Sequence, residues 1–171
     1  EEHLARLERS LAEVDIHNPH SREHWQTLCD ELLQHNGGGN LSVYLQITRG
    51  AADKRDHAFP SPAVTPTVFM MTSPIAVPAA DSPDTAVGAK AITLDDIRWA
   101  RCDIKSVSLL ANSLLRQQAV AAGAAEAILL RDGFVTEGSA SNVFVVKDGS
   151  IATPPKSHAI LGGITRDLVV E

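Results

Sequence analysis

Hydrophobic residues near the start of the chain recur at intervals of three and four positions. The apolar positions are Leu4, Leu7, Leu11 and Val14. This spacing places them on one face of a helix, so the pattern predicts an amphipathic helix over residues 2–14. Arg6 lies roughly opposite this stripe, and periodicity alone therefore predicts a solvated charge there.

The pattern then changes from a helical period to an extended one. Ser21 precedes a second helical pattern over residues 22–35 and is a suitable N-cap. Strict alternation of apolar and polar residues follows at 41–48, which indicates a half-buried strand. A second strand is predicted over 64–71, where Pro66 indicates either an edge or a strand start.

A stretch rich in proline and small residues separates this region from the rest of the chain. It contains Pro74, Pro78 and Pro83. Such composition is typical of a linker between lobes. We therefore predict an α+β fold with a small lobe at 1–77, a linker at 78–85 and a second lobe at 86–171.

The second lobe begins with a predicted short strand at 90–94. Thr93 followed by Asp96 has the form of a capping box, which predicts a helical turn at 95–99. An Ala- and Leu-rich run then predicts a helix over 108–122 that ends at a glycine.

Two hairpins are predicted after this helix. Strands at 126–130 and 134–136 flank the turn sequence Arg-Asp-Gly, and strands at 143–146 and 150–153 flank Lys-Asp-Gly. The second lobe is thus expected to begin as a meandering β-structure with a helix packed on it.

Composition narrows the classes of function. The chain has 171 residues, 44% of them hydrophobic, and a net charge of -6, which argues against a nucleic-acid-binding surface. No apolar stretch reaches the ~20 residues that span a bilayer, so no membrane partner is expected. The two cysteines, Cys29 and Cys102, form no disulfide framework, which favours the cytoplasm. Both ends look cut, as in a fragment. The histidines outside the loop at 51–57 show no metal-ligand spacing, so no metal is expected and these are read as surface residues: His17, His20, His24, His35 and His158.

Three segments of the second lobe carry candidate chemistry. Lys105 precedes an apolar run, and partial burial would lower the pKa of its amine. Glu137 ends a predicted strand, and the turn at 162–165 opens a helix whose N–H groups suit a phosphate. Each feature alone is most often an ordinary lysine, turn acid or turn. Together they are the amine, carboxylate and phosphate site that a pyridoxal phosphate enzyme needs.

The same segments resemble the fold-type IV pyridoxal phosphate aminotransferases, and among them the D-amino acid transaminases. The resemblance extends from His3 to Leu168 and is most specific over 95–106, 134–144 and 160–167. It implies a two-lobed fold with both lobes truncated, pyridoxal 5′-phosphate as cofactor, and a homodimer with active sites near the subunit interface.

The resemblance also implies roles for individual residues. Lys105 would form the Schiff base and carry the proton between the substrate α-carbon and the cofactor C4′ carbon, while Glu137 would contact the pyridine nitrogen. Relatives often have a serine where this chain has Ala140. The other residues implied to bind the cofactor are Arg6, Ser141, Asn142, Leu161, Ile164 and Thr165.

Arg55 and His57 carry the specificity signal. Two cationic donors two residues apart on a loop can bind a carboxylate, and the pair resembles the carboxylate trap of D-amino acid transaminases. The resemblance implies transamination between a D-amino acid and a 2-oxo acid, of the D-alanine/2-oxoglutarate type. Three alternatives stay open on the same fold: branched-chain L-amino acid or amine transamination, aminodeoxychorismate lyase, and an inactive fragment.

Overall fold

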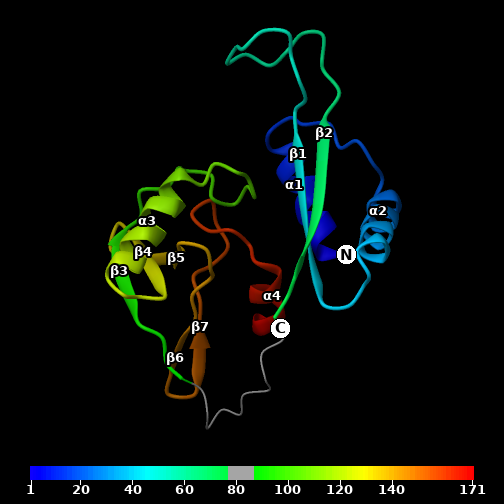
Figure 1. Ribbon diagram of the computed structural model, residues 1–171. Helices are drawn as coiled ribbons and strands as arrows, with labels where there is room; N and C mark the ends of the chain where they lie inside the picture. The colour runs from blue at the N-terminus through cyan, green and yellow to red at the C-terminus, as the bar shows by residue number, and fades with distance from the viewer. Residues whose placement is uncertain (77–86) are drawn as a thin grey trace. The chain divides into compact units, whose positions relative to one another are not determined.

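The computed structural model describes residues 1–76 and 87–171 and forms two compact units (Figure 1). One unit runs from His3 to Thr85 and the other from Ala86 to Glu171. The predicted linker, 78–85, lies outside the described residues. Among the described helices, none has both the length and the apolar character needed to cross a membrane.

The first unit contains two helices and a two-stranded sheet. Its elements are α1 (Glu2–Ala12), α2 (Arg22–His35), β1 (Leu41–Thr48) and β2 (Thr67–Pro74). The strands pair antiparallel over their full length, and α2 packs against both of them. All four predicted elements are therefore present.

The boundaries of β2 and α1 differ from the predicted ones. β2 begins at Thr67, directly after Pro66, because proline has no N–H to donate to a ladder; the strand-start interpretation is confirmed. α1 ends at Ala12, two residues early. The predicted solvation of Arg6 is wrong: Arg6 is only 9% exposed, and Ser10, one turn further on the same face, is also buried.

α2 begins as predicted, with a hydroxyl cap. The Ser21 Oγ accepts a hydrogen bond from the backbone N–H of His24 at 3.3 Å. Within the helix, Trp25 is completely buried and donates its indole N–H to Asn18 Oδ1 at 3.0 Å. The cap thus fixes the first turn of the helix whose aromatic residue forms the core of this unit.

Loss of this cap should have a small, measurable cost. We expect Ser21→Ala to lower the free energy of unfolding by about 1 kcal/mol, because an N-cap oxygen satisfies one otherwise unpaired helix N–H. Urea denaturation followed by circular dichroism measures the change. Ser21→Asn retains an acceptor and is the matched control, and an equal loss in both variants would contradict the capping role.

The second unit is built on a three-stranded sheet with the order β3-β4-β5. Its elements are β3 (Ala91–Asp95), α3 (Leu110–Ala121), β4 (Glu126–Arg131) and β5 (Phe134–Gly138). β3 and β4 are parallel and α3 forms the crossover between them, so the expected meander is wrong at its first step. β4 and β5 form the predicted antiparallel hairpin.

A second hairpin and a short helix complete this unit. They are β6 (Val145–Lys147), β7 (Ser150–Ala152) and α4 (Ile164–Val170). Both hairpin turns place an Asp and then a Gly at positive φ, 53° and 82° in the first turn and 51° and 76° in the second. These values fit the tight turn whose twist matches paired strands, which confirms both Asp-Gly predictions.

The core of the second unit lies between α3 and the sheet. Five buried residues form it, with Ile92 and Leu94 packed against them: Leu115, Ala119, Ala124, Ala127 and Leu129. The small alanines let the helix approach β4 closely. This packing fixes the loops that leave β3 and β5, and those loops carry the candidate site.

The predicted helical turn at 95–99 is absent. Thr93 lies within β3 opposite Ile128, and Asp96 continues the strand by donating its N–H to Leu130 O at 2.7 Å. The Asp96 carboxylate binds Arg98 and Thr136 and does not cap a helix. Tertiary pairing of β3 therefore overrides the local capping pattern.

Candidate active site

A cavity of about 600 Å³ opens in the second unit, on one side of α3. Four segments line it: the loop after β3, the polar side of α3, the turn after β5, and the loop that leads to α4. Volumes of this size are typical of pockets that hold a small molecule.

This cavity brings together residues that lie far apart in the sequence. Its lining contains five of the predicted site residues: Lys105, Glu137, Ser141, Asn142 and Leu161. The residue Lys105 is exposed, so the partial burial expected for its amine is not found. The flanking residues Cys102 and Ile104 are buried and anchor the lysine loop, and Cys102 is the small packed residue that the sequence suggests.

Glu137 is buried at the inner wall of the cavity, with 6% of its surface exposed. One carboxylate oxygen accepts from Arg98, and the other accepts from Asn142 Nδ2 and from the backbone N–H of Leu161, both at 3.0 Å. Burial raises the pKa of Glu137, against the opposing effect of the Arg98 guanidinium. The three donors hold the carboxylate in one orientation.

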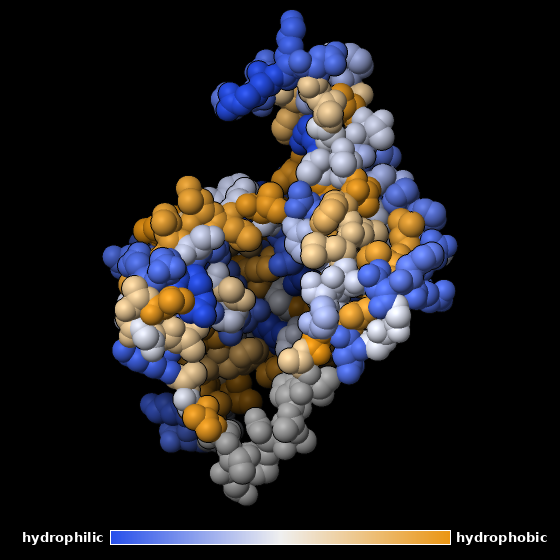
Figure 2. Space-filling view, in the orientation of Figure 1, coloured by the Kyte–Doolittle hydropathy of each residue, from blue (hydrophilic) through white to orange (hydrophobic). Residues whose placement is uncertain are grey.

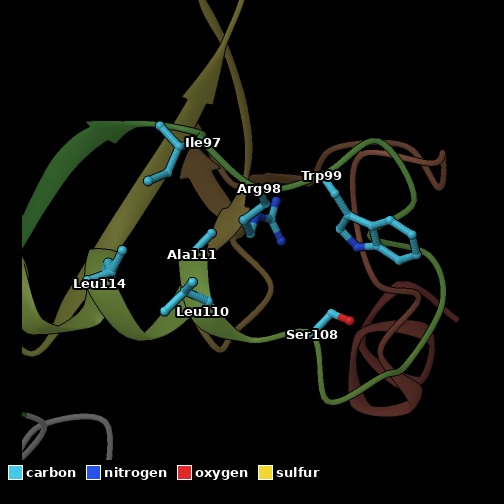
Figure 3. Close-up of a pocket in the computed structure, with 7 residues that line it drawn as sticks. All are labelled: Ile97, Arg98, Trp99, Ser108, Leu110, Ala111 and Leu114. Atoms are coloured by element: carbon cyan, nitrogen blue, oxygen red, sulfur yellow. The ribbon is translucent and has the colours of Figure 1, made fainter. Parts of the chain in front are cut away.

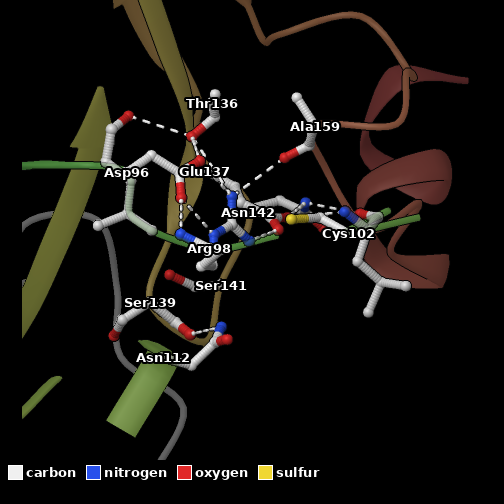
Figure 4. A network of polar contacts seen from close by, with 12 residues as sticks. Asp96, Arg98, Cys102, Asn112, Thr136, Glu137, Ser139, Ser141, Asn142 and Ala159 are labelled. Carbon is white, nitrogen blue, oxygen red and sulfur yellow. Dashed lines mark hydrogen bonds and ion pairs between the residues drawn. The ribbon is translucent and has the colours of Figure 1, made fainter. Parts of the chain in front are cut away.

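Arg98 connects this carboxylate to the sheet (Figure 4). Its guanidinium is 4% exposed and also binds Asp96, through Nε and Nη2 at 2.9 Å, and the carbonyl oxygen of Ala159 at 3.0 Å. Burial opposes the charge on Arg98, but the carboxylates of Asp96 and Glu137 outweigh it and raise the pKa of Arg98. One buried cation therefore fixes two buried anions.

The acidity of Asp96 predicts a loss of stability in acid. Burial would raise the pKa of Asp96, but hydrogen bonds from Arg98 and Thr136 lower it from 3.8 to about 2. A depressed folded-state pKa stabilises the protein above about pH 4, and this stabilisation disappears as the pH falls towards 2. We expect about 2 kcal/mol of the free energy of unfolding to be lost over that range.

Urea denaturation at pH values between 5 and 2 tests this dependence. Asp96→Asn cannot titrate, so its stability should fall less steeply over the same interval. Parallel acid limbs for the wild type and this variant would show that another carboxylate is responsible.

Asn142 and Gly163 close the cavity on the side of α4. Asn142 Nδ2 also donates to the carbonyl oxygen of Leu161 at 2.9 Å. A Cβ atom built on Gly163 would clash with Asn142 Oδ1, so position 163 has no room for a side chain while Asn142 holds Glu137. Glycine is therefore a steric requirement of this wall.

The remaining predicted residues do not line the cavity. Ile164 and Thr165 begin α4 immediately after Gly163, but within the described part of the chain the lining stops at that glycine. Arg6, Arg55 and His57 belong to the first unit. Arg55 and His57 are exposed on the loop between β1 and β2, as a substrate-binding pair would require.

Several residues of the site were not singled out from the sequence. Arg98 and Asp96 lie within the segment at 95–106, yet an Arg two residues after an Asp is common in any sequence. Glu126 and Asn112 belong to a strand and a helix whose periodicity explains them without function. A buried ion pair is visible only after β3, β4 and β5 are paired.

A second hollow, of about 370 Å³, lies on the surface near α3 (Figure 3). Ile97 and Trp99 come from the loop after β3, and Leu110, Ala111 and Leu114 come from α3. Apolar side chains are visible at the surface of this unit, coloured orange in Figure 2. Among the described residues that line this hollow, the one ionisable group is Arg98, which is already paired, so the larger cavity is the candidate active site.

Comparison with known proteins agrees with this assignment. A model of the amino-transferase class IV family matches residues 1–171. The D-alanine aminotransferases of Bacillus licheniformis and Listeria innocua are 44% and 40% identical to the chain over 171 and 170 residues. These matches cover 100% and 99% of the chain but only 59% and 58% of the relatives.

The fold has the same affiliation. A branched-chain amino acid aminotransferase from T.th., solved with pyridoxamine 5′-phosphate, superposes with a TM-score of 0.82 at 30% identity. That match covers 99% of this chain and 55% of the solved one. The truncated fold-type IV architecture expected from the sequence is thereby confirmed, and the chain belongs to the amino-transferase class IV family.

Proposed function

We propose that the protein to which this chain belongs is a pyridoxal phosphate-dependent aminotransferase that moves an amino group from a D-amino acid to a 2-oxo acid. The observation that carries the proposal is the presence of Lys105 and the buried Glu137 on the wall of one cavity. The 44% identity to a D-alanine aminotransferase supports the choice of substrate class.

The residues of the cavity fit the cofactor. A carboxylate can accept about four hydrogen bonds, and the three donors on Glu137 leave capacity for one more, the N–H of a pyridinium ring. Leu161 would pack against the ring. Arg6 and the backbone N–H groups of Ile164 and Thr165 would bind the phosphate, since the first N–H groups of a helix have no partner within it.

Bound pyridoxal phosphate supplies an aldehyde that reacts with amines and a ring that takes up electron density from the substrate α-carbon. Lys105 would hold the cofactor through its amine and, once released, move the proton between the α-carbon and C4′. Glu137 stays ionised opposite Arg98 and would stabilise the protonated ring nitrogen. Asn142 and Arg98 keep that carboxylate in place.

Substrate selection is proposed to reside in Arg55 and His57, whose side chains can bind an α-carboxylate in a fixed orientation. We further propose a homodimer that works in the cytoplasm, in line with two cysteines that are both free in the structure. Branched-chain amino acid transamination is the second candidate, favoured by the likeness to the solved branched-chain enzyme.

A trapping experiment tests the cofactor assignment. The protein is incubated with pyridoxal phosphate, reduced with borohydride and digested, and peptides are analysed by mass spectrometry. We expect the pyridoxyl mass on the peptide that contains Lys105 and on no other lysine peptide. Label on several surface lysines, with none on Lys105, would overturn the assignment.

A comparison of amino donors tests the substrate class. We expect D-alanine with 2-oxoglutarate to be turned over faster than L-leucine, and Arg55→Ala to raise the KM for D-alanine by at least roughly tenfold, the cost of losing a charged hydrogen bond. A preference for L-leucine that Arg55→Ala leaves unchanged would favour the branched-chain alternative.

A further inference from the structure

The turn that follows Glu137 has an unusual foundation. Residues 138–142 form one wall of the cavity. The backbone N–H of Gly138 donates to Ser141 O at 2.6 Å, and that of Ser139 donates to Ala127 O on β4 at 3.1 Å. From the opposite side, Asn112 Nδ2 on α3 donates to Ser139 O at 2.7 Å. The turn is therefore held from both sides.

The carboxylate of Glu126, the first residue of β4, lies directly behind this turn. Its Oε1 accepts from the hydroxyl of Ser139 and from the N–H groups of Ser139 at 3.2 Å and Ala127 at 2.8 Å. Its Oε2 accepts from the Ser141 hydroxyl at 2.8 Å. Burial would raise the pKa of Glu126, but these hydroxyl and N–H donors outweigh it and lower the pKa.

The fit between this carboxylate and the turn is sterically tight. A Cβ atom on Gly138 would clash with Ser141 Oγ and would lie 3.1 Å from Glu126 Cδ and Oε2. Glycine at 138 therefore lets the serine hydroxyl and the carboxylate pack against the backbone. The hydroxyl groups of Ser139 and Ser141 are both directed at Glu126.

We propose that Glu126 is the positioning residue of the cofactor-binding wall, and that Ser139 and Ser141 act through it and not on the cofactor. This proposal rests on the proposed function. A serine hydroxyl has one proton to donate, and that of Ser141 is bound by Glu126. Ser141 can therefore give no hydroxyl proton to the cofactor, which revises the direct role that the resemblance implies for it.

The consequence for the site follows from chain connectivity. Glu137 precedes the turn, and Asn142, which binds Glu137 and Leu161, follows it. A displaced turn would move both residues. The carboxylate that meets the pyridine nitrogen thus depends on an acid one layer behind the cavity.

Hydrogen exchange tests the positioning role without any cofactor. In the cofactor-free protein, Glu126→Gln should accelerate exchange of the amide hydrogens in 138–142 by roughly tenfold, because an amide cannot accept at both atoms. Ser139→Ala, which removes one donor, should give a smaller acceleration. Glu31→Gln, on the exposed side of α2, is the matched control. Unchanged exchange in both test variants would overturn the proposal.

Cofactor affinity tests the link to the proposed function. We expect Glu126→Gln and Ser141→Ala each to raise the dissociation constant of pyridoxal phosphate by roughly tenfold, and the double variant to be no weaker than Glu126→Gln alone. Additive losses would show that Ser141 contacts the cofactor directly, against the proposal. Faster exchange in Glu126→Gln, with no pyridoxal phosphate binding even in the wild type, would refute the proposed function but leave the anchoring of the turn by Glu126 intact.

Discussion

Arg98→Met is expected to lower the free energy of unfolding by about 3–5 kcal/mol, because removing one partner of a buried ion pair leaves an unpaired buried charge. Here two carboxylates lose their partner at once. The side chains of Asp96 and Glu137 are 0% and 7% exposed, so water cannot replace the guanidinium. Methionine has a similar volume, and the loss therefore reflects charge and not a cavity.

Urea denaturation of the cofactor-free protein measures this loss. Arg101→Met is the matched control, since Arg101 pairs with Asp103 in a setting where both side chains are about 30% exposed, 32% and 29%. An exposed pair contributes at most about 1 kcal/mol. Equal losses in the two variants would show that the network around Arg98 adds no stability beyond that of a surface pair.

A second substitution separates charge from shape. Adding Glu137→Gln to Arg98→Met removes one of the unpaired anions, so the double variant should be more stable than Arg98→Met alone. This non-additivity is expected for residues that share one network.

Elements with local signals were the predictable part of this fold. The Ser21 cap, the alternation over β1 and the two Asp-Gly turns each depend on residues within a few positions of one another. Interactions of that range are encoded in short segments. The boundaries moved by two or three residues where proline or helix fraying decides them, as at Pro66 and Ala12.

The network around Glu137 was not predictable in the same way. Thr93 and Asp96 match a capping box as well as any helix start does, and the pattern contains no information on what β3 will pair with. Only the parallel pairing with β4 places Asp96 beside Thr136, 40 positions away. Arg98 then becomes the one group that neutralises two strands' acids.

Lys105 and Glu137 were found by a different route. Neither residue is distinctive alone, and the structure leaves the lysine exposed. Their value as a signal came from three segments that match one kind of cofactor chemistry together. The cavity now supplies the physical reason, since loops after β3 and β5 line the same wall.

Lys105→Ala is expected to reduce transamination by at least about 10²–10⁴-fold, the range that a positioned acid–base group contributes to a proton transfer. The variant should still bind pyridoxal phosphate, because Glu137, Asn142 and Arg98 are untouched. We therefore expect little change in cofactor affinity beside a large loss of turnover. Single-turnover kinetics with D-alanine and equilibrium dialysis of the cofactor measure the two effects separately.

Rescue by a small amine distinguishes a lost proton carrier from a damaged site. Methylamine added to Lys105→Ala should restore part of the turnover, with a rate that depends on amine concentration, since it can occupy the vacated space and accept the α-proton. Lys147→Ala, in the turn between β6 and β7, removes an exposed amine outside the cavity lining and should leave the rate unchanged. If Lys105→Ala retained wild-type turnover, or if it lost cofactor binding together with activity and could not be rescued, the amine at 105 would not be the proton carrier. The chemistry would then have to reside in another lining residue.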